Sequence, residues 1–316
     1  AMAEAQVGDD DFIEDPTINR LQDRAAQIFG REAGLFVPSG TMGNLTCIIA
    51  HTRQGQEVIC EEAGHIYNYE MASMAAVAGV LARVITTDNG ILTWTMVQKA
   101  IRPKIYYRPQ TGLVSLENTH NMAGGTVYPT AVVDEVWDKS HELGVKVHLD
   151  GARIFNAARY LKHDVATLTR KFDSVQFCLS KGLGAPVGSL IVGSREFIER
   201  CRSIRKMLGG GMRQAGVLAA AGLIALEEGP KRLQEDHDHA QFLARQLAEI
   251  PGIGIQLDRV QTNIVIYSVK NAGFSSSDFL AALANRGVLA VPVDTDRVRM
   301  VTHLDVNRKD VETASA

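Results

Sequence analysis

The sequence has no long hydrophobic run and no excess of positive charge. Its longest apolar run, from Ala215 to Leu226, is well short of the ~20 residues that span a bilayer. Lys and Arg number 33 against 36 Asp and Glu, which gives a net charge of −3 and no basic footprint for nucleic acid or an anionic membrane. We therefore expect neither a nucleic acid nor a membrane as partner, and a small molecule as substrate.

Cysteine is scarce, and its spacing excludes a disulfide framework. The four cysteines lie far apart and form no Cys-x-x-Cys pair, which is typical of a reducing, cytoplasmic setting. His237 and His239 are close in sequence, but residues two apart on a helix do not share a face. Their pattern favours a solvated helix face, so no metal site is predicted.

Short apolar runs alternate with amphipathic helical patterns over the first two thirds of the chain. Helices are predicted over Thr41–His51 and Thr130–Leu143, the second ending at Gly144. This alternation predicts an α/β fold with a mostly parallel sheet covered on both faces. The expected strands are Leu35–Val37, Glu57–Cys60, Ala82–Thr86, Leu113–Glu117, Val145–Asp150, Ser174–Leu179 and Ser189–Val192.

The pattern changes near Glu227-Glu228-Gly229-Pro230. Beyond it, a helix is predicted over Lys231–Ile250, followed by short apolar runs and a helix over Ser276–Arg286. This α+β pattern has about the length of the smallest independent domains. We predict a large domain at residues 1–235 and a small C-terminal domain at residues 236–316.

Lys181 follows the apolar run Val175–Leu179 and lies among glycines in Ser180-Lys181-Gly182-Leu183-Gly184. A lysine at the end of a buried strand is partly desolvated, which favours the amine chemistry of a Schiff base. The glycines let a bulky ring approach it. The alternative is a lysine on an ordinary surface turn.

Asp150 ends a strand in which Val145, Val147 and Leu149 alternate with polar residues. Ligands of open α/β sheets gather at such carboxyl ends. A carboxylate there can hold a pyridinium nitrogen protonated. The alternative is an aspartate that caps the following helix.

Ser39, Gly40 and Thr41 lie between a short strand and a helix. Backbone N–H groups at a helix start bind anions, and the two hydroxyls add donors. The alternative is a capped helix start without a ligand. Taken together, a phosphate cradle, the strand-end Asp150 and the strand-end Lys181 are the parts needed to hold pyridoxal phosphate (PLP).

The roles of two further segments are not decided by the residues alone. Lys206 and Arg213 flank the glycine-rich run Met207–Met212, which is either a surface loop or an anion site. His65 and Glu70 follow an apolar strand, and the residues alone do not separate His65 from a structural histidine.

Five longer strings closely resemble the L-threonine aldolase family. They occur in the family's order over nearly the whole chain: Leu116–Asn121, His148–Ala157, Cys178–Ser189, Lys206–Gln214 and Val301–Val306. The resemblance implies an aspartate-aminotransferase-like fold, with a seven-stranded, mostly parallel sheet in the large domain and a small α+β C-terminal domain. It also implies a homotetramer, a dimer of dimers with sites at subunit interfaces.

The activity implied by the resemblance is a PLP-dependent carbon–carbon cleavage. L-Threonine, L-allo-threonine and related β-hydroxy-α-amino acids would give glycine and an aldehyde. By motif, Lys181 would form the Schiff base, Asp150 would face the ring nitrogen, and His65 would stack on the ring. Gly40 and Thr41 would seat the phosphate.

The substrate side of the site is implied in the same way. Arg153, beside the cofactor, and Arg299 would bind the substrate carboxylate. Lys206 and Arg213 match positions that reach a neighbouring subunit's site, where they would contact the cofactor.

The sequence departs from the family at two points. The family's opening Asp-Leu-Arg-Ser-Asp-Thr-type segment has no counterpart before Ala1, so we expect a disordered or truncated start. Tyr107, or else Tyr106, stands where many members have a histidine near the substrate hydroxyl. A tyrosine hydrogen-bonds a hydroxyl but is a weak base near neutral pH. The catalytic base is therefore left open between His65 and Tyr107.

Other activities stay open at this point. The same residues serve other PLP enzymes of this fold, such as a phenylserine aldolase, a β-lyase or an amino-acid racemase. A non-catalytic homologue is a further alternative. An aldehyde product distinguishes the aldolase from a β-lyase or racemase, and failure to bind PLP would indicate the non-catalytic homologue.

Overall fold

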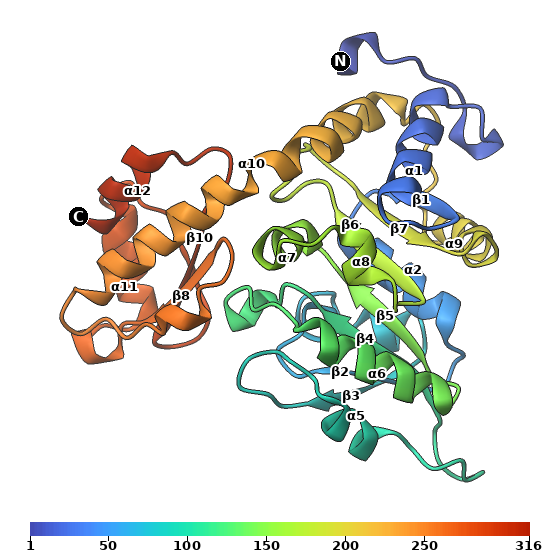
Figure 1. Ribbon diagram of the computed structural model, residues 1–316, viewed down its shortest axis with the longest axis horizontal. Helices are drawn as coiled ribbons and strands as arrows, with labels where there is room; N and C mark the ends of the chain where they lie inside the picture. The colour runs from blue at the N-terminus through green and yellow to red at the C-terminus, as the bar shows by residue number, and fades with distance from the viewer.

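A seven-stranded sheet forms the centre of the larger part of the chain in the computed structural model, which describes residues 1–316 (Figure 1). The strand order is β1-β7-β6-β5-β4-β2-β3, and β7 runs antiparallel to the others. The predicted α/β fold with a mostly parallel sheet is confirmed. The strands are β1 Ala33–Val37, β2 Glu57–Glu61, β3 Leu81–Ile85, β4 Thr111–Glu117, β5 Lys146–Asp150, β6 Ser174–Cys178 and β7 Ser189–Gly193.

Helices cover both faces of this sheet, and the strands β2, β6 and β7 are therefore buried along their whole length. The first face packs against α1 Pro16–Ile28, α5 Trp94–Ala100, α6 Thr130–Glu142, α7 Ile154–Leu161 and α8 Val165–Thr169. The second packs against α2 Gly40–His51, α3 His65–Asn68, α4 Ser73–Ala76 and α9 Arg195–Met207. The helices predicted over 41–51 and 130–143 are thus confirmed.

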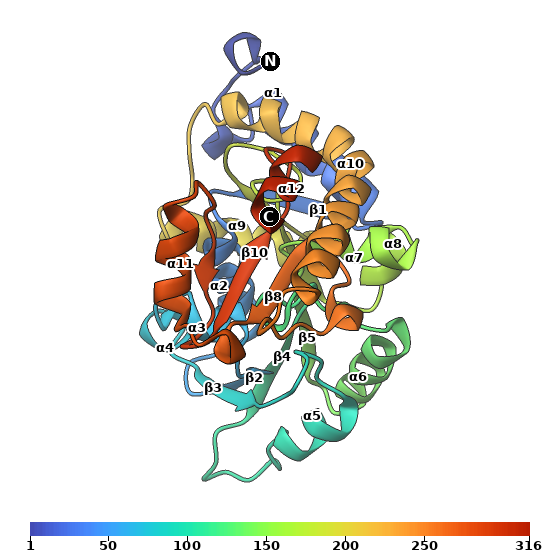
Figure 2. The same cartoon turned by 90° about the vertical axis from the view of Figure 1, so that its left-hand side faces the viewer.

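A three-stranded antiparallel sheet, in the order β8-β10-β9, forms the second part of the chain. Figures 1 and 2 show it with its helices at one end of the molecule. Its own apolar core contains Leu243, Leu247, Tyr267 and Met300. The elements are β8 Ile264–Ser268, β9 Val291–Pro292, β10 Arg297–Val301, α11 Ser276–Ala284 and α12 Arg308–Ser315.

The helix α10, Gly216–Ala248, joins the two parts (Figure 1). The sequence pattern predicted a helix that begins only at Lys231, because Pro230 has no backbone N–H to donate and normally interrupts a helix. In the structure Pro230 lies inside α10, whose N-terminal half packs against α1 and whose C-terminal half belongs to the small core. The predicted division at residue 235 falls within this helix and stays a prediction.

Gly229 brings α10 into contact with the segment that carries Lys181. A Cβ atom added at Gly229 would lie 2.7 Å from both Cα and the carbonyl oxygen of Leu183. Backbone atoms cannot move aside as a flexible side chain can. The absence of a side chain at Gly229 therefore sets how closely the helix approaches the Lys181 turn.

We expect Gly229→Ala to lower the free energy of unfolding by about 1–3 kcal/mol, because overpacking against backbone outweighs the better helix propensity of alanine. Urea denaturation would measure this change. The matched control is Glu228→Ala, the exposed neighbour on the same helix, for which a change within about 0.5 kcal/mol is expected. Equal stability of the two variants would contradict the close approach.

Candidate functional site

The parallel register of β4, β5 and β6 brings their carboxyl ends to one edge of the sheet. Glu117, the last residue of β4, is paired with Asp150, the last residue of β5. Asp150 is paired in turn with Gln176 of β6, and Lys181 follows that strand by three residues. The structure therefore brings together the predicted aspartate and lysine, as the strand-end argument expected.

Asp150 is buried and is held by two hydrogen-bond donors. The Asn44 amide nitrogen donates to Oδ2 at 2.8 Å, and the backbone N–H of Ala152 donates to Oδ1 at 3.1 Å. Each carboxylate oxygen has a further lone pair. Asp150 can therefore accept one more hydrogen bond from a ligand at the sheet edge.

His65, the first residue of α3, forms a pair with the buried Glu70. The His65 Nδ1 lies 2.8 Å from Glu70 Oε1, and ligand atoms of His65, Glu70 and Asp150 all lie within 4.8 Å of one another. The hydrogen bond to Glu70 raises the pKa of His65, and burial raises the pKa of Glu70. Asn44 also donates to Glu70 Oε1, at 2.9 Å, so its amide bridges the two carboxylates.

Lys181 is half-buried and close enough to His65 for its positive charge to oppose the rise in the pKa of that imidazole. The start of α2 lies next to the end of the lysine's strand, since a Cβ atom at Gly40 would lie 3.0 Å from the Sγ atom of Cys178. Ser39 caps α2, accepting a hydrogen bond from the Met42 N–H at 3.2 Å. The predicted cradle of Ser39, Gly40 and Thr41 thus adjoins the same edge.

Arg153 and Arg299 come from different parts of the chain and meet at one oxygen atom. Arg299 of β10 donates to Asn121 Oδ1 at 2.6 Å, and Arg153 donates to the same atom at 3.4 Å. Burial lowers the pKa of both guanidinium groups, and the charge of Arg299 lowers that of Arg153 further. Arg299 Nε is buried without a partner. Two cations that share a neutral amide form a binding site for an anion.

Lys206 and Arg213 are exposed and paired within the chain. Lys206 Nζ lies 2.6 Å from Asp11, and Arg213 Nη1 lies 2.6 Å from Asp9. Between these two aspartates, the buried Asp10 pairs with the buried Arg205. The structure therefore holds both predicted cations against the N-terminal segment, and their expected reach into a neighbouring subunit stays a prediction.

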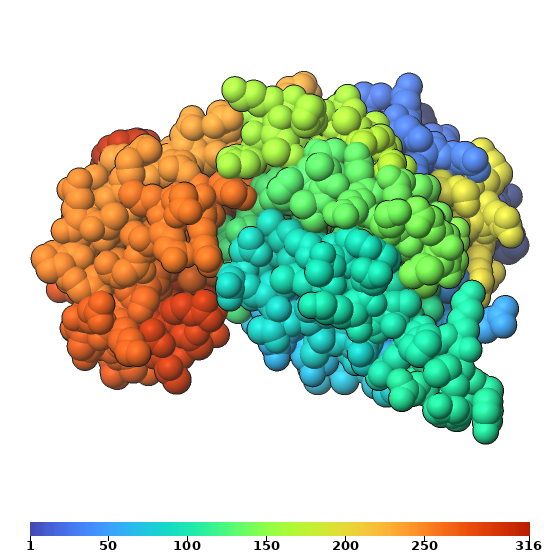
Figure 3. Space-filling model, turned by 60° about the horizontal axis from the view of Figure 1, so that its bottom comes forward, coloured from blue at the N-terminus to red at the C-terminus, as the bar shows by residue number.

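Within one chain, Tyr107 does not lie near Asp150 and Lys181. The tyrosine precedes β4, whose amino end is at the edge of the sheet opposite Asp150, and 65% of its surface is exposed. Its loop projects from the body of the molecule between α5 and β4 (Figures 1 and 3). Within one chain, Tyr107 therefore lies too far from the site residues to contact a substrate bound there.

Two side chains to which the sequence argument gave no role, Asn44 and Asn121, lie at the centre of the site. Glu70, which the sequence left open beside His65, lies there as well. Asn44 lies one turn after Thr41 on the helix that follows the cradle, and Asn121 follows the end of β4. In the sequence, Asn44 and Asn121 could have been selected only because each lies close to a predicted helix start or strand end.

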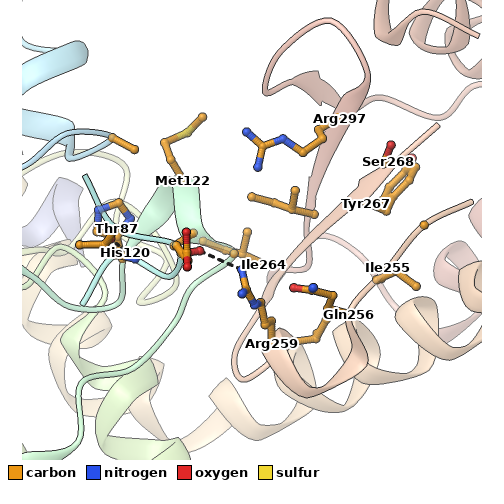
Figure 4. Close-up of a pocket in the computed structure, with 18 of the residues that line it drawn as sticks. Thr87, His120, Met122, Ile255, Gln256, Arg259, Ile264, Tyr267, Ser268 and Arg297 are labelled. Carbon is orange, nitrogen blue, oxygen red and sulfur yellow. Dashed lines mark hydrogen bonds between the residues drawn. The ribbon is translucent and has the colours of Figure 1, made fainter. Parts of the chain in front are cut away.

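A cavity of about 620 Å³ lies between the two parts of the chain (Figure 4). His120, Thr87 and Met122 line it from the large part, and Arg259 and Gln256 from the small part. Arg259 donates to the backbone oxygen of Asp88 at 2.8 Å, which ties the two parts together. Lys181 and Asp150 do not line this cavity, so it is adjacent to the site and distinct from it.

Comparisons with known proteins show what this chain is similar to. A family model described as beta-eliminating lyase matches residues 1–272. Low-specificity L-threonine aldolase 1 of Arabidopsis thaliana is 42% identical over 316 residues, covering 98% of this chain and 88% of the relative. The low specificity L-threonine aldolase of Escherichia coli strain K12 is 41% identical over 317 residues, covering 100% and 92%.

Among solved structures, the threonine aldolase of Leishmania major superposes with a TM-score of 0.78 at 19% identity. The superposition covers 96% of this chain and 88% of that one, and it shows that the two share a fold. The sequence relatives show more, because their identity exceeds 40% over nearly the full length of both chains. The chain belongs to the low-specificity L-threonine aldolase family, within the beta-eliminating lyases.

Proposed function

We propose that this protein cleaves L-threonine, L-allo-threonine and related β-hydroxy-α-amino acids to glycine and an aldehyde, with PLP as cofactor. The observation that carries the proposal is the convergence of Arg153 and Arg299 on Asn121, beside the strand ends that hold Asp150 and Lys181. An amino acid presents a carboxylate to two guanidinium groups and an amine to the lysine side.

The residues present fit PLP. Asp150 keeps a free lone pair for a protonated ring nitrogen, because each of its oxygens has one donor only. The first N–H groups of α2 have no partner within the helix, so they can receive a phosphate together with the hydroxyl of Thr41. Lys181 supplies the amine that would hold the cofactor, and His65 supplies a flat ring near Asp150.

When bound, PLP supplies an electron sink that accepts the electron pair of the broken Cα–Cβ bond. The chain itself binds and orients the amino acid. Arg153 and Arg299 hold the carboxylate through planar, charge-assisted hydrogen bonds, which fixes the direction of the Cα–Cβ bond. Asp150 would keep the ring nitrogen of bound PLP protonated, which would strengthen PLP as an electron sink.

His65 is the base that the structure favours for the β-hydroxyl proton. Its Nδ1 is engaged by Glu70, so in the neutral ring Nε2 has the lone pair that accepts a proton. Tyr107 of the same chain is at the opposite edge of the sheet. Any contact of Tyr107 with a substrate would come from a second subunit.

We extend the proposal to a homotetramer, a dimer of dimers with sites at subunit interfaces. Lys206, Arg213 and Tyr107 are exposed and lie outside their own chain's site, as residues that serve a neighbour would. A cytoplasmic location is also proposed, because all four cysteines are buried free thiols, as in a reducing compartment. No helix of the structure has the length and apolar character needed to cross a membrane.

The first test of the proposed function is the product formed from L-threonine in the presence of PLP. We expect acetaldehyde and glycine in equal amounts and no ammonia, with all product lost in Lys181→Ala. The visible absorbance of the PLP–lysine adduct should vanish in the same variant. Lys309→Ala, on an exposed helix start, is the control. Ammonia release without glycine would instead indicate β-elimination.

Arg299→Lys tests the carboxylate site. Lysine keeps the charge but loses the planar fork, so we expect KM for L-threonine to rise about 10–100-fold with a smaller change in kcat. Arg297→Lys is the matched control, two residues earlier on the same strand and paired with Asp294 at the surface. An unchanged KM in Arg299→Lys would remove this residue from the substrate site.

Glu70→Gln tests the base through the pH dependence of kcat. His65 must be neutral to accept a proton, so activity falls as the pH drops through its pKa, which the pairing with Glu70 raises. Removal of the carboxylate lowers the pKa of His65, so the acid limb of the profile should move to lower pH. Glu62→Gln, an exposed change before α3, should leave the limb in place. A limb that does not move in Glu70→Gln would exclude His65 as the base.

A further inference from the structure

A chain of hydrogen-bonded side chains runs inward from the half-buried His51, at the end of α2, to the buried Asp150. His51 Nε2 lies 2.8 Å from Ser174 Oγ, which lies 2.8 Å from His148 Nδ1. His148 Nε2 lies 3.2 Å from Asn44 Oδ1, and the Asn44 amide nitrogen lies 2.8 Å from Asp150. Ser174 and His148 are fully buried, and Asn44 is 1% exposed. Water therefore cannot replace a lost partner along the inner part of this chain.

Secondary structure places these side chains on one side of the sheet. Asn44 and His51 are seven residues apart on α2 and therefore share a helix face. His148 and Asp150 are two residues apart on β5 and therefore point to the same face of the sheet. Ser174 begins the adjacent strand β6, where it is paired with His148.

One arrangement of hydrogen atoms satisfies every link. The Asn44 amide donates both of its hydrogens, to Glu70 and to Asp150, so its Oδ1 must accept from His148 Nε2–H. Nδ1 of the neutral His148 ring is then an acceptor for the Ser174 hydroxyl, which accepts in turn from His51 Nε2–H.

The charge states of the two histidines agree with this arrangement. Burial lowers the pKa of His148 to about 4 and that of His51 to about 3, so both rings are neutral at pH 7. The charged groups that face His51 are Asp173, Lys146 and Arg200, and the one that faces His148 is Asp150. A neutral imidazole ring has one donor and one acceptor nitrogen. His148 needs both, because its Nε2–H donates to Asn44 and its Nδ1 accepts from Ser174.

The orientation of Asn44 has a consequence for Asp150. With the amide reversed, Asn44 Oδ1 would lie against the oxygens of Asp150 and Glu70, and its NH₂ group would face a donor on His148. Acceptor against acceptor favours a proton on Asp150. A protonated Asp150 has lost the negative charge that would keep a pyridine nitrogen protonated.

We propose that His148 and Ser174 are positioning residues that lock the Asn44 amide, so that Asp150 stays an acceptor carboxylate for the ring nitrogen of the cofactor. The inference rests on the proposed PLP function and adds to it residues that do not touch the cofactor. His148 acts through Asn44, and Ser174 acts through His148.

The test uses PLP carrying ¹⁵N in its ring, bound to the full-length protein. We expect the wild-type ring nitrogen to give the NMR shift of a protonated pyridine. In His148→Leu, which removes the donor to Asn44, we expect the unprotonated shift and about tenfold weaker PLP binding, measured by fluorescence titration of the apoprotein. His148→Gln restores a donor and an acceptor, so it should recover both readouts.

Two further variants complete the design. Ser174→Ala removes the donor to His148 and should act in the same direction with a smaller effect, so it decides the matter if His148→Leu does not fold. His163→Gln is the control, since His163 is exposed and takes no part in this chain of hydrogen bonds.

The proposal that His148 and Ser174 fix the Asn44 amide would be wrong if the ring nitrogen stays protonated and the PLP affinity is unchanged in the folded His148→Leu and in Ser174→Ala. A His148→Gln variant that behaves like His148→Leu would overturn it as well. A wild-type protein that binds no PLP would overturn the proposed function itself, and this is seen before any variant is compared.

Discussion

The site depends on the parallel alignment of β4, β5 and β6. Because these strands run in the same direction and in register, Glu117, Asp150 and the segment that carries Lys181 reach one edge together. The start of α2 packs against the end of β6 at Gly40, which brings the predicted phosphate cradle to that edge. Residues more than 100 positions apart therefore form one site without any loop having to reach across the sheet.

Neutral amides hold together groups of like charge within this site. Asn44 bridges the carboxylates of Glu70 and Asp150, and Asn121 bridges the guanidinium groups of Arg153 and Arg299. Like charges brought together and partly desolvated are costly, so each pair favours a ligand of opposite charge. An amino-acid substrate would supply a carboxylate to the guanidinium groups, and the protonated ring nitrogen of PLP would supply a positive charge to Asp150.

The sequence was sufficient for the parts of the site that follow from strand ends and helix starts. Asp150, Lys181 and the Ser39–Thr41 segment were selected in this way, because the hydrophobic alternation shows where a strand ends, and the structure places them at one edge of the sheet. The mostly parallel sheet follows from the same alternation, and the family resemblance implied its seven strands. Arg153 and Arg299 were assigned by resemblance alone, since no local pattern shows that β10 packs its arginine against the large part of the chain.

Other features could not be obtained from local patterns. The helix α10 continues through Pro230 because packing on both sides stabilises it, against the local preference of proline. Tyr107 matches a family position in sequence but lies at the amino end of β4, because the loop before that strand is at the far edge of the sheet. Asn44 and Asn121 gained importance only when the fold brought charged side chains to them.

The most direct test of this account is to identify the lysine that holds the cofactor. The PLP-loaded protein would be reduced with borohydride, digested and mapped by mass spectrometry. The account predicts that the pyridoxyl group is found on Lys181, in the peptide that follows β6. A stoichiometric label on any other lysine would contradict the arrangement of the site around the ends of β4, β5 and β6.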